Sequence, residues 1–297
     1  MYGFLRARLS AAFRPAPASV RGVGRMPAFS HRCLAAMNHS RLRPKFRLFL
    51  LPVLVAALGF ASPAGAQITE WTTTVAPGRF LLEMDALSLT LDREGGGKYT
   101  AIGAASTFLT TGLAYNWDLQ LGAELFISQK FEDDDFTERN SGIGDIYVRT
   151  KWRFYEDTET GTAIAILPYI KIPTNSGGVG NHATEGGIIV PWTTKLWGGI
   201  EFNAMAELDF LRNDANDGYD TNWYTSVALT RPLTRAVGLY AEAAFGKSSG
   251  AADADGILGG GVTIALSDRT WWDFAVYRGL SRGAADWNHV VRFNLSF

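Results

Sequence analysis

The sequence predicts an all-β protein: a transmembrane antiparallel up-and-down β-barrel of about 12 strands, preceded by a cleaved signal peptide. Three observations lead to this prediction. A short apolar run follows a basic N-terminal part that contains no acidic residue. Beyond it, apolar and polar residues alternate with period two in segments of about 10 to 15 residues, longer than the about 5 to 6 of an ordinary strand. The connections between these segments alternate between short and long, as they do in outer-membrane barrels.

The N-terminal part cannot anchor the chain in a membrane as a helix. Residues 1–66 hold ten Lys and Arg residues and no acid, and their apolar run covers residues 48–61. That run is 14 residues long and contains Pro52, whereas a membrane-spanning helix needs about 20 apolar residues. An organelle transit peptide would also be rich in Arg and free of acids, but it would be amphipathic.

The order of these features is instead that of a secretory signal. A positive end and a short apolar stretch lead to Ala64 and Ala66, whose small side chains form an Ala-x-Ala cleavage site. We therefore expect a signal peptide at residues 37–66 and cleavage before Gln67. No signal requires residues 1–36, which we interpret as an upstream extension from a misassigned start.

Charge and cysteine content limit what the exported part, residues 67–297, can do. It holds all 29 acidic residues against 18 basic ones, a formal net charge of −11. Such a surface repels a phosphate backbone, so nucleic-acid binding is not expected. The single cysteine, Cys33, lies in the leader, so the exported part can form neither an internal disulfide nor a thiolate metal site.

The alternation divides each segment into two chemically different faces. In the last segment Trp287, Val291 and Phe293 share one face, and Arg292 and Asn294 share the other. Successive strand residues point to opposite sides, so strands of this length with two such faces need apolar surroundings on one side and water on the other. Twelve segments show the pattern, near residues 79–91, 98–112, 118–130, 142–154, 162–173, 184–194, 197–211, 221–231, 236–247, 256–266, 271–280 and 287–297.

The connections predict which end of the barrel faces which side of the membrane. Short periplasmic turns, longer outer loops and two periplasmic termini are typical of outer-membrane barrels, and closure removes sheet edges that lipid would not tolerate. The short connections are residues 113–117, 155–161, 195–196, 232–235 and 267–270. The longer and more acidic ones are residues 92–97, 131–141, 174–183, 212–220, 248–255 and 281–286.

A secreted β-sandwich also alternates and is the competing fold. The length of the strands, charges in the middle of their polar faces and aromatic residues at their ends favour the barrel, since interfacial aromatic girdles flank its apolar band. The aromatic residues at strand ends are Trp117, Trp152, Trp192, Trp197, Trp223, Trp271, Trp272 and Trp287.

Two motifs resemble a known family. Gly142-Ile143-Gly144-Asp145 opens one strand, Pro168-Tyr169-Ile170-Lys171-Ile172-Pro173-Thr174 ends another, and an aromatic strand closes the chain. This combination resembles the outer-membrane transporters of the MetA pathway of phenol degradation family over most of residues 80–297. The resemblance implies a channel for aromatic or other hydrophobic compounds. The residues alone favour structural roles for Gly142, Gly144 and Pro173, because glycine relieves crowding at a strand start.

Groups suited to catalysis are sparse in the exported part. Its two histidines are His182, in a loop rich in Gly and Asn, and His289, which shares the outward face with Val291. A Ser-His-Asp triad needs its histidine within about 3 Å of the nucleophile. We therefore expect no enzyme, although a barrel enzyme acting on lipid is a remote alternative.

The acidic clusters at residues 132–135 and 214–218 lack the alternating spacing and terminal Glu of a calcium loop. Their simplest interpretation is a pair of solvated loops, and the functional alternative is loose binding of divalent cations that offsets repulsion from anionic outer-leaflet lipid. No cofactor and no metal site are expected.

The inward face is where function is expected. Most of its cations lie on two adjacent strands and its acids dominate across the barrel, so opposed charges would line a polar pore; the alternative is an ion-pair network that plugs the lumen. The pore-lining candidates are Glu83, Glu124, Asp145, Arg149, Lys151, Arg153, Lys171, Glu201, Glu207, Glu242, Asp273 and Arg292.

The positions of the turns predict cross-strand pairs within this lining. If the 131–141 loop and the 155–161 turn join antiparallel neighbours, Glu124 lies near Arg149, and Asp145 lies near Lys171. At the end of the chain, apolar residues at every second position up to Phe297 resemble the terminal signal read by the outer-membrane assembly machinery.

The expected function is passive uptake of small, aromatic or hydrophobic solutes through a channel in the bacterial outer membrane. The alternative is a structural or envelope-adhesion barrel with a closed lumen. The segment 67–78 is too short for a substantial plug domain, which argues against energised transport. The expected partners are outer-membrane lipid and lipopolysaccharide, the assembly machinery and the small-molecule solute.

Overall fold

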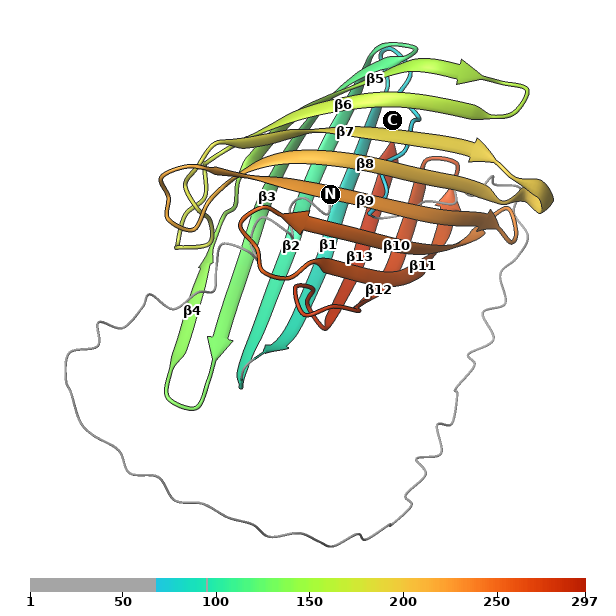
Figure 1. Ribbon diagram of the computed structural model, residues 1–297. Helices are drawn as coiled ribbons and strands as arrows, with labels where there is room; N and C mark the ends of the chain where they lie inside the picture. The colour runs from blue at the N-terminus through green and yellow to red at the C-terminus, as the bar shows by residue number, and fades with distance from the viewer. Residues whose placement is uncertain (1–67, 95) are drawn as a thin grey trace, which may run out of the picture. The chain divides into compact units, whose positions relative to one another are not determined.

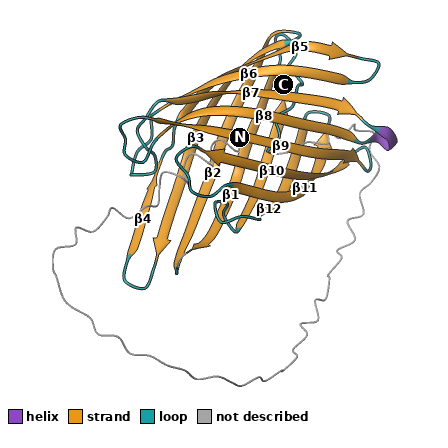
Figure 2. Ribbon diagram, in the orientation of Figure 1, coloured by secondary structure: helices purple, strands orange, loops and turns teal. Residues whose placement is uncertain are grey.

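A computed structural model describes residues 68–94 and 96–297. The expected signal peptide, its cleavage site and the upstream extension lie outside the described residues. Strands dominate the described part, and its one helical element is a short 3-10 turn, η1 (Trp197–Gly199), visible in Figure 2. Within the same ranges, no helix has the length and apolarity to cross a membrane.

The strands join in one antiparallel sheet (Figure 1). Their bounds are β1 Phe80–Glu94, β2 Gly97–Ala114, β3 Trp117–Glu132, β4 Thr137–Gly142, β5 Ile146–Asp157, β6 Thr162–Ile172, β7 Glu185–Lys195, β8 Glu201–Arg212, β9 Tyr219–Pro232, β10 Val237–Ser248, β11 Asp255–Ser267, β12 Thr270–Gly279 and β13 Trp287–Ser296.

The sheet closes into a barrel. Strand β1 pairs with β13 on one side and with β2 on the other, and β2 also pairs with β3. Strands β4 and β5 both pair with β3 in one continuous register, Ile127 opposite Gly142 and Ala123 opposite Ile146. These two short strands are therefore the halves of one wall strand. The wall has the 12 antiparallel strands that the alternation predicted, and the barrel prediction is confirmed.

The outer connection expected at residues 131–141 is mostly strand. The β3–β4 hairpin continues to Glu132 and resumes at Thr137, which leaves only a four-residue turn. Asp133 fixes this turn, because its Oδ1 accepts hydrogen bonds from the backbone N–H groups of Asp135 at 3.0 Å and Phe136 at 2.7 Å. An acidic side chain that bonds its own backbone in this way favours a tight turn.

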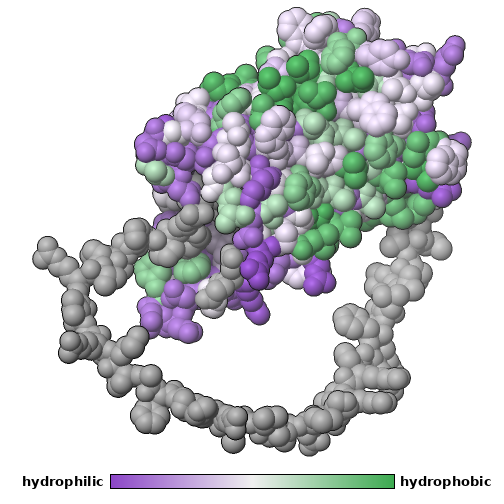
Figure 3. All heavy atoms as spheres, viewed as in Figure 1, coloured by the Kyte–Doolittle hydropathy of each residue, from purple (hydrophilic) through white to green (hydrophobic). Residues whose placement is uncertain are grey.

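The outward face of the wall is apolar. Large hydrophobic side chains are exposed at alternate positions of most strands, and Figure 3 shows them gathered over the wall on the visible side. So extensive an exposed apolar surface requires hydrocarbon rather than water as its solvent. Several of the aromatic residues predicted at strand ends are among the exposed residues: Trp117, Trp152, Trp192, Trp197, Trp223 and Trp287.

The start of the first strand and the end of the chain are joined to each other. Phe80 and Phe297 exchange two backbone hydrogen bonds, of 2.8 and 2.9 Å. Their rings stack with centroids 5.4 Å apart. The C-terminal residue thus completes the seam that closes the barrel.

The segment before the first strand lies inside the barrel. Ile68, Thr69 and Thr72 are each at most 3% exposed. Beyond one isolated bridge between Pro77 and Gly112, the segment is joined to the wall through side chains rather than by strand pairing. We call residues 68–79 the N-terminal segment.

Candidate functional site

The barrel interior contains most of the predicted pore-lining residues. The alternating burial along the strands places polar and ionisable side chains inside, opposite the exposed apolar ones. Glu83, Arg153 and Glu201 are partly exposed. The buried ones are Glu124, Asp145, Arg149, Lys151, Lys171, Glu207, Glu242, Asp273 and Arg292.

Glu242 of β10 anchors the start of the N-terminal segment. Its Oε1 accepts hydrogen bonds from the backbone N–H groups of Ile68 at 3.1 Å and Thr69 at 2.9 Å. The hydroxyl of Tyr277 donates to the other carboxylate oxygen. The Thr69 hydroxyl also lies 2.9 Å from that of Ser226 on β9. A buried carboxylate is well satisfied by several donors, and here two of them come from the segment.

Glu70 bonds to the opposite side of the wall. Its carboxylate lies 2.8 Å from Arg149 Nη1 and 3.8 Å from Lys151 Nζ, both on β5. Burial by itself would raise the pKa of Glu70, but the charges of Arg149 and Lys151 outweigh it and hold that pKa well below its usual range. The carboxyl group therefore stays ionised and paired at neutral pH.

Apolar side chains of the segment fill the space between these two anchors. Ile68 belongs to a buried cluster inside the barrel, and Trp71 packs against it. The wall residues of this cluster are Leu167, Ile189, Met205, Tyr224, Ala228, Tyr240, Ala244, Ile257, Ala275 and Tyr277. The lumen is thus neither a water-filled hole nor an ion-pair network alone, because the chain's own segment occupies it.

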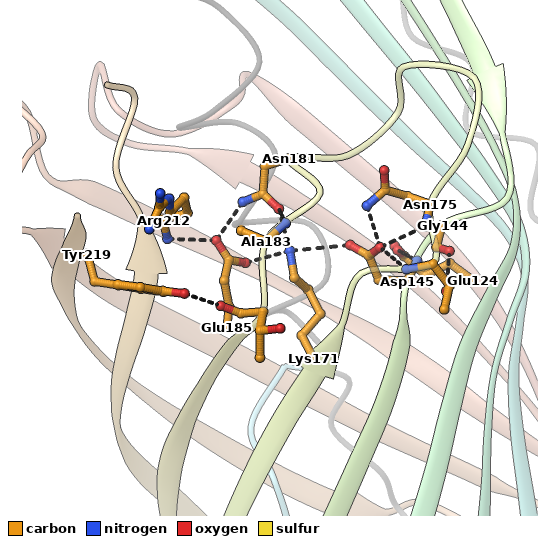
Figure 4. Close-up of polar contacts among 12 residues, drawn as sticks. Glu124, Gly144, Asp145, Lys171, Asn175, Asn181, Ala183, Glu185, Arg212 and Tyr219 are labelled. Carbon is orange, nitrogen blue, oxygen red and sulfur yellow. Dashed lines mark hydrogen bonds and ion pairs between the residues drawn. The ribbon is translucent and has the colours of Figure 1, made fainter. Parts of the chain in front are cut away.

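A second polar network lies at the other end of the lumen, where the β6–β7 loop turns inward (Figure 4). Lys171 Nζ lies 3.3 Å from Asp145 Oδ2 and 2.7 Å from Glu185 Oε2, and it donates to Asn181 Oδ1 at 2.7 Å. Glu185 Oε1 accepts from Asn181 Nδ2 at 2.6 Å and from the backbone N–H of Arg212 at 2.8 Å. The network ties the loop to four neighbouring wall strands.

The two motifs that carried the family resemblance contact each other in this network. The backbone N–H groups of Thr174 and Asn175 donate to Asp145 Oδ1 at 3.2 and 3.1 Å. A Cβ at Gly142 would overlap the Ser176 backbone, and one at Gly144 would overlap the Glu124 carboxylate. Both glycines thus have structural roles, as expected, and the reason is the close approach of the loop and of Glu124.

The predicted neighbour of Arg149 is wrong. Arg149 lies opposite Gln120 in the β3–β5 register, and its Nε donates to Gln120 Oε1 at 2.7 Å. Glu124 instead accepts from the backbone N–H of Asp145 at 3.1 Å. The cause is the position of the turn. Residues 133–136 lie nearer to β3 than the middle of the expected loop, residues 131–141, does. The partner of Arg149 on β3 is therefore Gln120, four residues before Glu124. The predicted approach of Asp145 to Lys171 is correct.

Across the barrel, polar contacts within the wall hold the remaining ionisable groups. Arg292 Nε donates to Asp85 Oδ1 at 2.7 Å, between β13 and β1. Asp273 accepts from the Thr263 hydroxyl at 2.5 Å and from Asn294 Nδ2 at 2.9 Å. These contacts join adjacent strands and do not involve the N-terminal segment.

The histidines lie apart from the lumen site. His182 is exposed in the β6–β7 loop, and His289 lies opposite Val276, an exposed residue of the outward face. The His289 ring stacks on Trp287 at 6.3 Å. Among the described residues, no cluster of three or more His, Cys, Asp or Glu residues could hold a metal ion.

Solved structures are similar to this barrel at low sequence identity. The COG4313 outer membrane channel from Pseudomonas putida F1 matches with a TM-score of 0.60 and 8% identity, over 78% of this chain and 100% of that chain. The beta domain of the Bordetella autotransporter BrkA matches with a TM-score of 0.48 and 15% identity, over 75% and 100% of the two chains. The NanC porin matches with a TM-score of 0.46 and 9% identity, over 73% and 98%.

Among curated protein sequences, none matches this chain. The first of the structural likenesses supports the fold of an outer-membrane barrel. The sequence itself matches one family over residues 65–297, which include the whole barrel and the segment inside it. The chain belongs to the family described as "Putative MetA-pathway of phenol degradation".

Proposed function

We propose that the protein is a passive outer-membrane channel for small solutes, aromatic or hydrophobic ones included, and that its N-terminal segment closes the lumen at rest. The observation that carries this proposal is the position of residues 68–79 inside the barrel. The wall binds the segment through side chains and one isolated bridge, so release of the segment leaves the strand pairing intact. Release would replace a filled lumen with one lined by polar and ionisable groups.

The same geometry argues against catalysis. The two histidines of the exported part lie on a loop and on the outward face, away from the ionisable groups of the lumen. We infer that the protein is not an enzyme. Lipid and lipopolysaccharide would contact the apolar outer face, and the seam completed by Phe297 would be where the assembly machinery acts.

A reversible cross-link tests the role of the segment. The hydroxyl oxygens of Thr69 and Ser226 are 2.9 Å apart, so Thr69→Cys with Ser226→Cys would place two thiols within reach of a disulfide. The exported part has no native cysteine, because Cys33 precedes it. We expect the oxidised double variant to show almost no openings in a planar bilayer and to recover wild-type conductance after reduction.

The two single-cysteine variants are the matched controls, and they should not respond to reductant. Equal conductance of the oxidised and reduced double variant would contradict gating by the segment. Absence of conductance in wild type and in every variant would favour the second candidate, a structural or envelope-adhesion barrel with a closed lumen. The Lys171 network, which ties the β6–β7 loop to the wall at the other end of the lumen, is the observation that favours that alternative.

A further inference from the structure

Two cations of β5, Arg149 and Lys151, face the N-terminal segment. Arg149 Nε donates to Gln120 Oε1 at 2.7 Å, and its guanidinium lies 4.1 Å from the centroid of the Phe108 ring. Lys151 lies opposite Asp118 in the β3–β5 register, and its Nζ donates to the carbonyl oxygen of Thr73 in the N-terminal segment at 3.4 Å. The contacts of Arg149 with Gln120 and Phe108 do not depend on the segment, so Arg149 would keep its place if the segment left.

Arg149 and Lys151 differ from Lys171 in where their carboxylate partners come from. Lys171 pairs with Asp145 and Glu185, which belong to the barrel wall. Arg149 and Lys151 instead take the carboxylate of Glu70 from the N-terminal segment. Removal of that carboxylate leaves the two buried cations with one wall carboxylate beside them, Asp118, and so with a net positive charge; burial of uncompensated charge is costly. The site therefore favours an anion in place of Glu70.

An apolar, aromatic surface adjoins the two cations. Tyr169 is the cross-strand partner of Arg149 on β6. Tyr169 packs both against Phe108 and Tyr147 and against the large apolar cluster of the lumen. Trp71, the residue after Glu70, packs against that same apolar cluster. Release of the segment therefore vacates a carboxylate position and a ring position together.

We infer that Arg149, Lys151 and the apolar surface around Tyr169 form a binding site for aromatic carboxylates, which Glu70 and Trp71 occupy in the closed channel. This inference rests on the proposed function, because the solute must replace the segment. A carboxylate can accept two hydrogen bonds from a guanidinium, and a ring buries apolar area against the cluster. A neutral phenol brings no anion to the two cations, and acetate leaves the apolar surface empty.

Calorimetric titration of the purified, folded mature protein tests the site with benzoate as the probe. Glu70→Gln removes the competing carboxylate but keeps the shape of the side chain. We expect this variant to bind benzoate about tenfold more tightly than wild type, the effect of losing one charge-assisted competitor. Glu138→Gln is the control: it removes the same charge from an exposed position on β4.

A second pair of variants tests the cations. Lys151→Gln in the Glu70→Gln background should remove most of the gain in benzoate affinity. Lys98→Gln in the same background removes an exposed lysine and should leave the gain in place. Heat-modifiable migration of each variant verifies that the barrel has folded, so a loss of binding can be assigned to the site.

Titrations with benzyl alcohol and acetate define the class of solute. Weak binding of both, together with tight binding of benzoate by Glu70→Gln, supports an aromatic carboxylate site. Equal binding of acetate and benzoate would overturn the aromatic part of the inference, and equal affinity of wild type and Glu70→Gln for benzoate would overturn the whole. Binding is measured without a membrane, so a barrel that binds benzoate but never conducts would contradict the proposed function and leave the site standing.

Discussion

Replacement of Glu242 by Gln should release the N-terminal segment while leaving the barrel folded. The carboxylate accepts from the backbone N–H groups of Ile68 at 3.1 Å and Thr69 at 2.9 Å, and from the Tyr277 hydroxyl. A glutamine amide offers one acceptor oxygen, and its NH₂ group must then face at least one of these donors. The substitution therefore removes at least one hydrogen bond and weakens those that remain.

The size of the effect follows from the number of bonds lost. A hydrogen bond to a charged group contributes about 1.5–3 kcal/mol, so the docked segment should lose about 3 kcal/mol. That change lowers the ratio of docked to released segment by about 100-fold. Strand pairing of β10 with β9 and β11 uses backbone groups, so we expect a much smaller change in the thermal unfolding of the barrel.

Single-channel recording in a planar bilayer measures the consequence as open probability, which should rise strongly in Glu242→Gln. Glu201→Gln is the matched control, because Glu201 is a partly exposed glutamate on β8 that accepts a hydrogen bond from Asn203 Nδ2 at 3.4 Å. Its open probability should equal that of wild type. An unchanged open probability in a folded Glu242→Gln barrel would show that this carboxylate does not hold the segment and would refute the reasoning.

Three further predictions test other parts of the structure. Because docking lowers the pKa of Glu70, its ion pairs stabilise the docked segment fully above the ordinary pKa of 4.5, and this stabilisation is lost as the pH falls through the lower pKa of the docked state. The open probability should therefore rise only in acid below about pH 4, and Glu70→Gln should abolish this rise. Gly144→Ala should lower the stability of the barrel by about 1–3 kcal/mol in thermal unfolding, because the new methyl group overlaps Glu124. Gly256→Ala should leave the stability unchanged, because its new Cβ would lie 3.6 Å from the nearest atom, Ser281 Oγ. Deletion of Phe297 should reduce the amount of heat-modifiable barrel in the outer membrane without blocking export, and a normal amount would contradict its role in assembly.

The sequence was sufficient to predict the wall of the barrel but not every register within it. Alternation alone gives the faces of a strand such as Trp287–Ser296, because side-chain direction has period two. Register depends on where a turn is placed, and the turn after β3 is fixed by a side-chain contact of Asp133. The four consecutive acids at residues 132–135 predict a longer loop than the chain forms, and Arg149 therefore pairs with Gln120, four residues before Glu124.

The sequence did not predict that residues 68–79 lie inside the barrel, for a different reason. Residues 68–79 have no period-two pattern, and their length excluded only a folded plug domain. Their place inside the barrel depends on long-range contacts, such as those of Glu70 with β5 and of Ile68 with β10. The segment does carry one signal: residues 68–71 place two apolar side chains, Ile68 and Trp71, around the acid Glu70. Nothing in that pattern names the wall residues that receive them.

Three cations of β5 lie in a row along the inside of the barrel wall. Arg149, Lys151 and Arg153 point to the same side of one strand, so successive charges are about 7 Å apart along it. Arg153 Nη2 donates to the carbonyl of Tyr115 in the β2–β3 turn, at the end of the barrel where β1 begins and β13 ends. That end is the periplasmic one in barrels of this topology. Glu70 covers the two inner cations, and in the proposed channel an anion in its place would next meet Arg153, which pairs with Glu156 at the periplasmic rim. If the segment closes the channel as proposed, its release and the passage of an anion would depend on the same side chains.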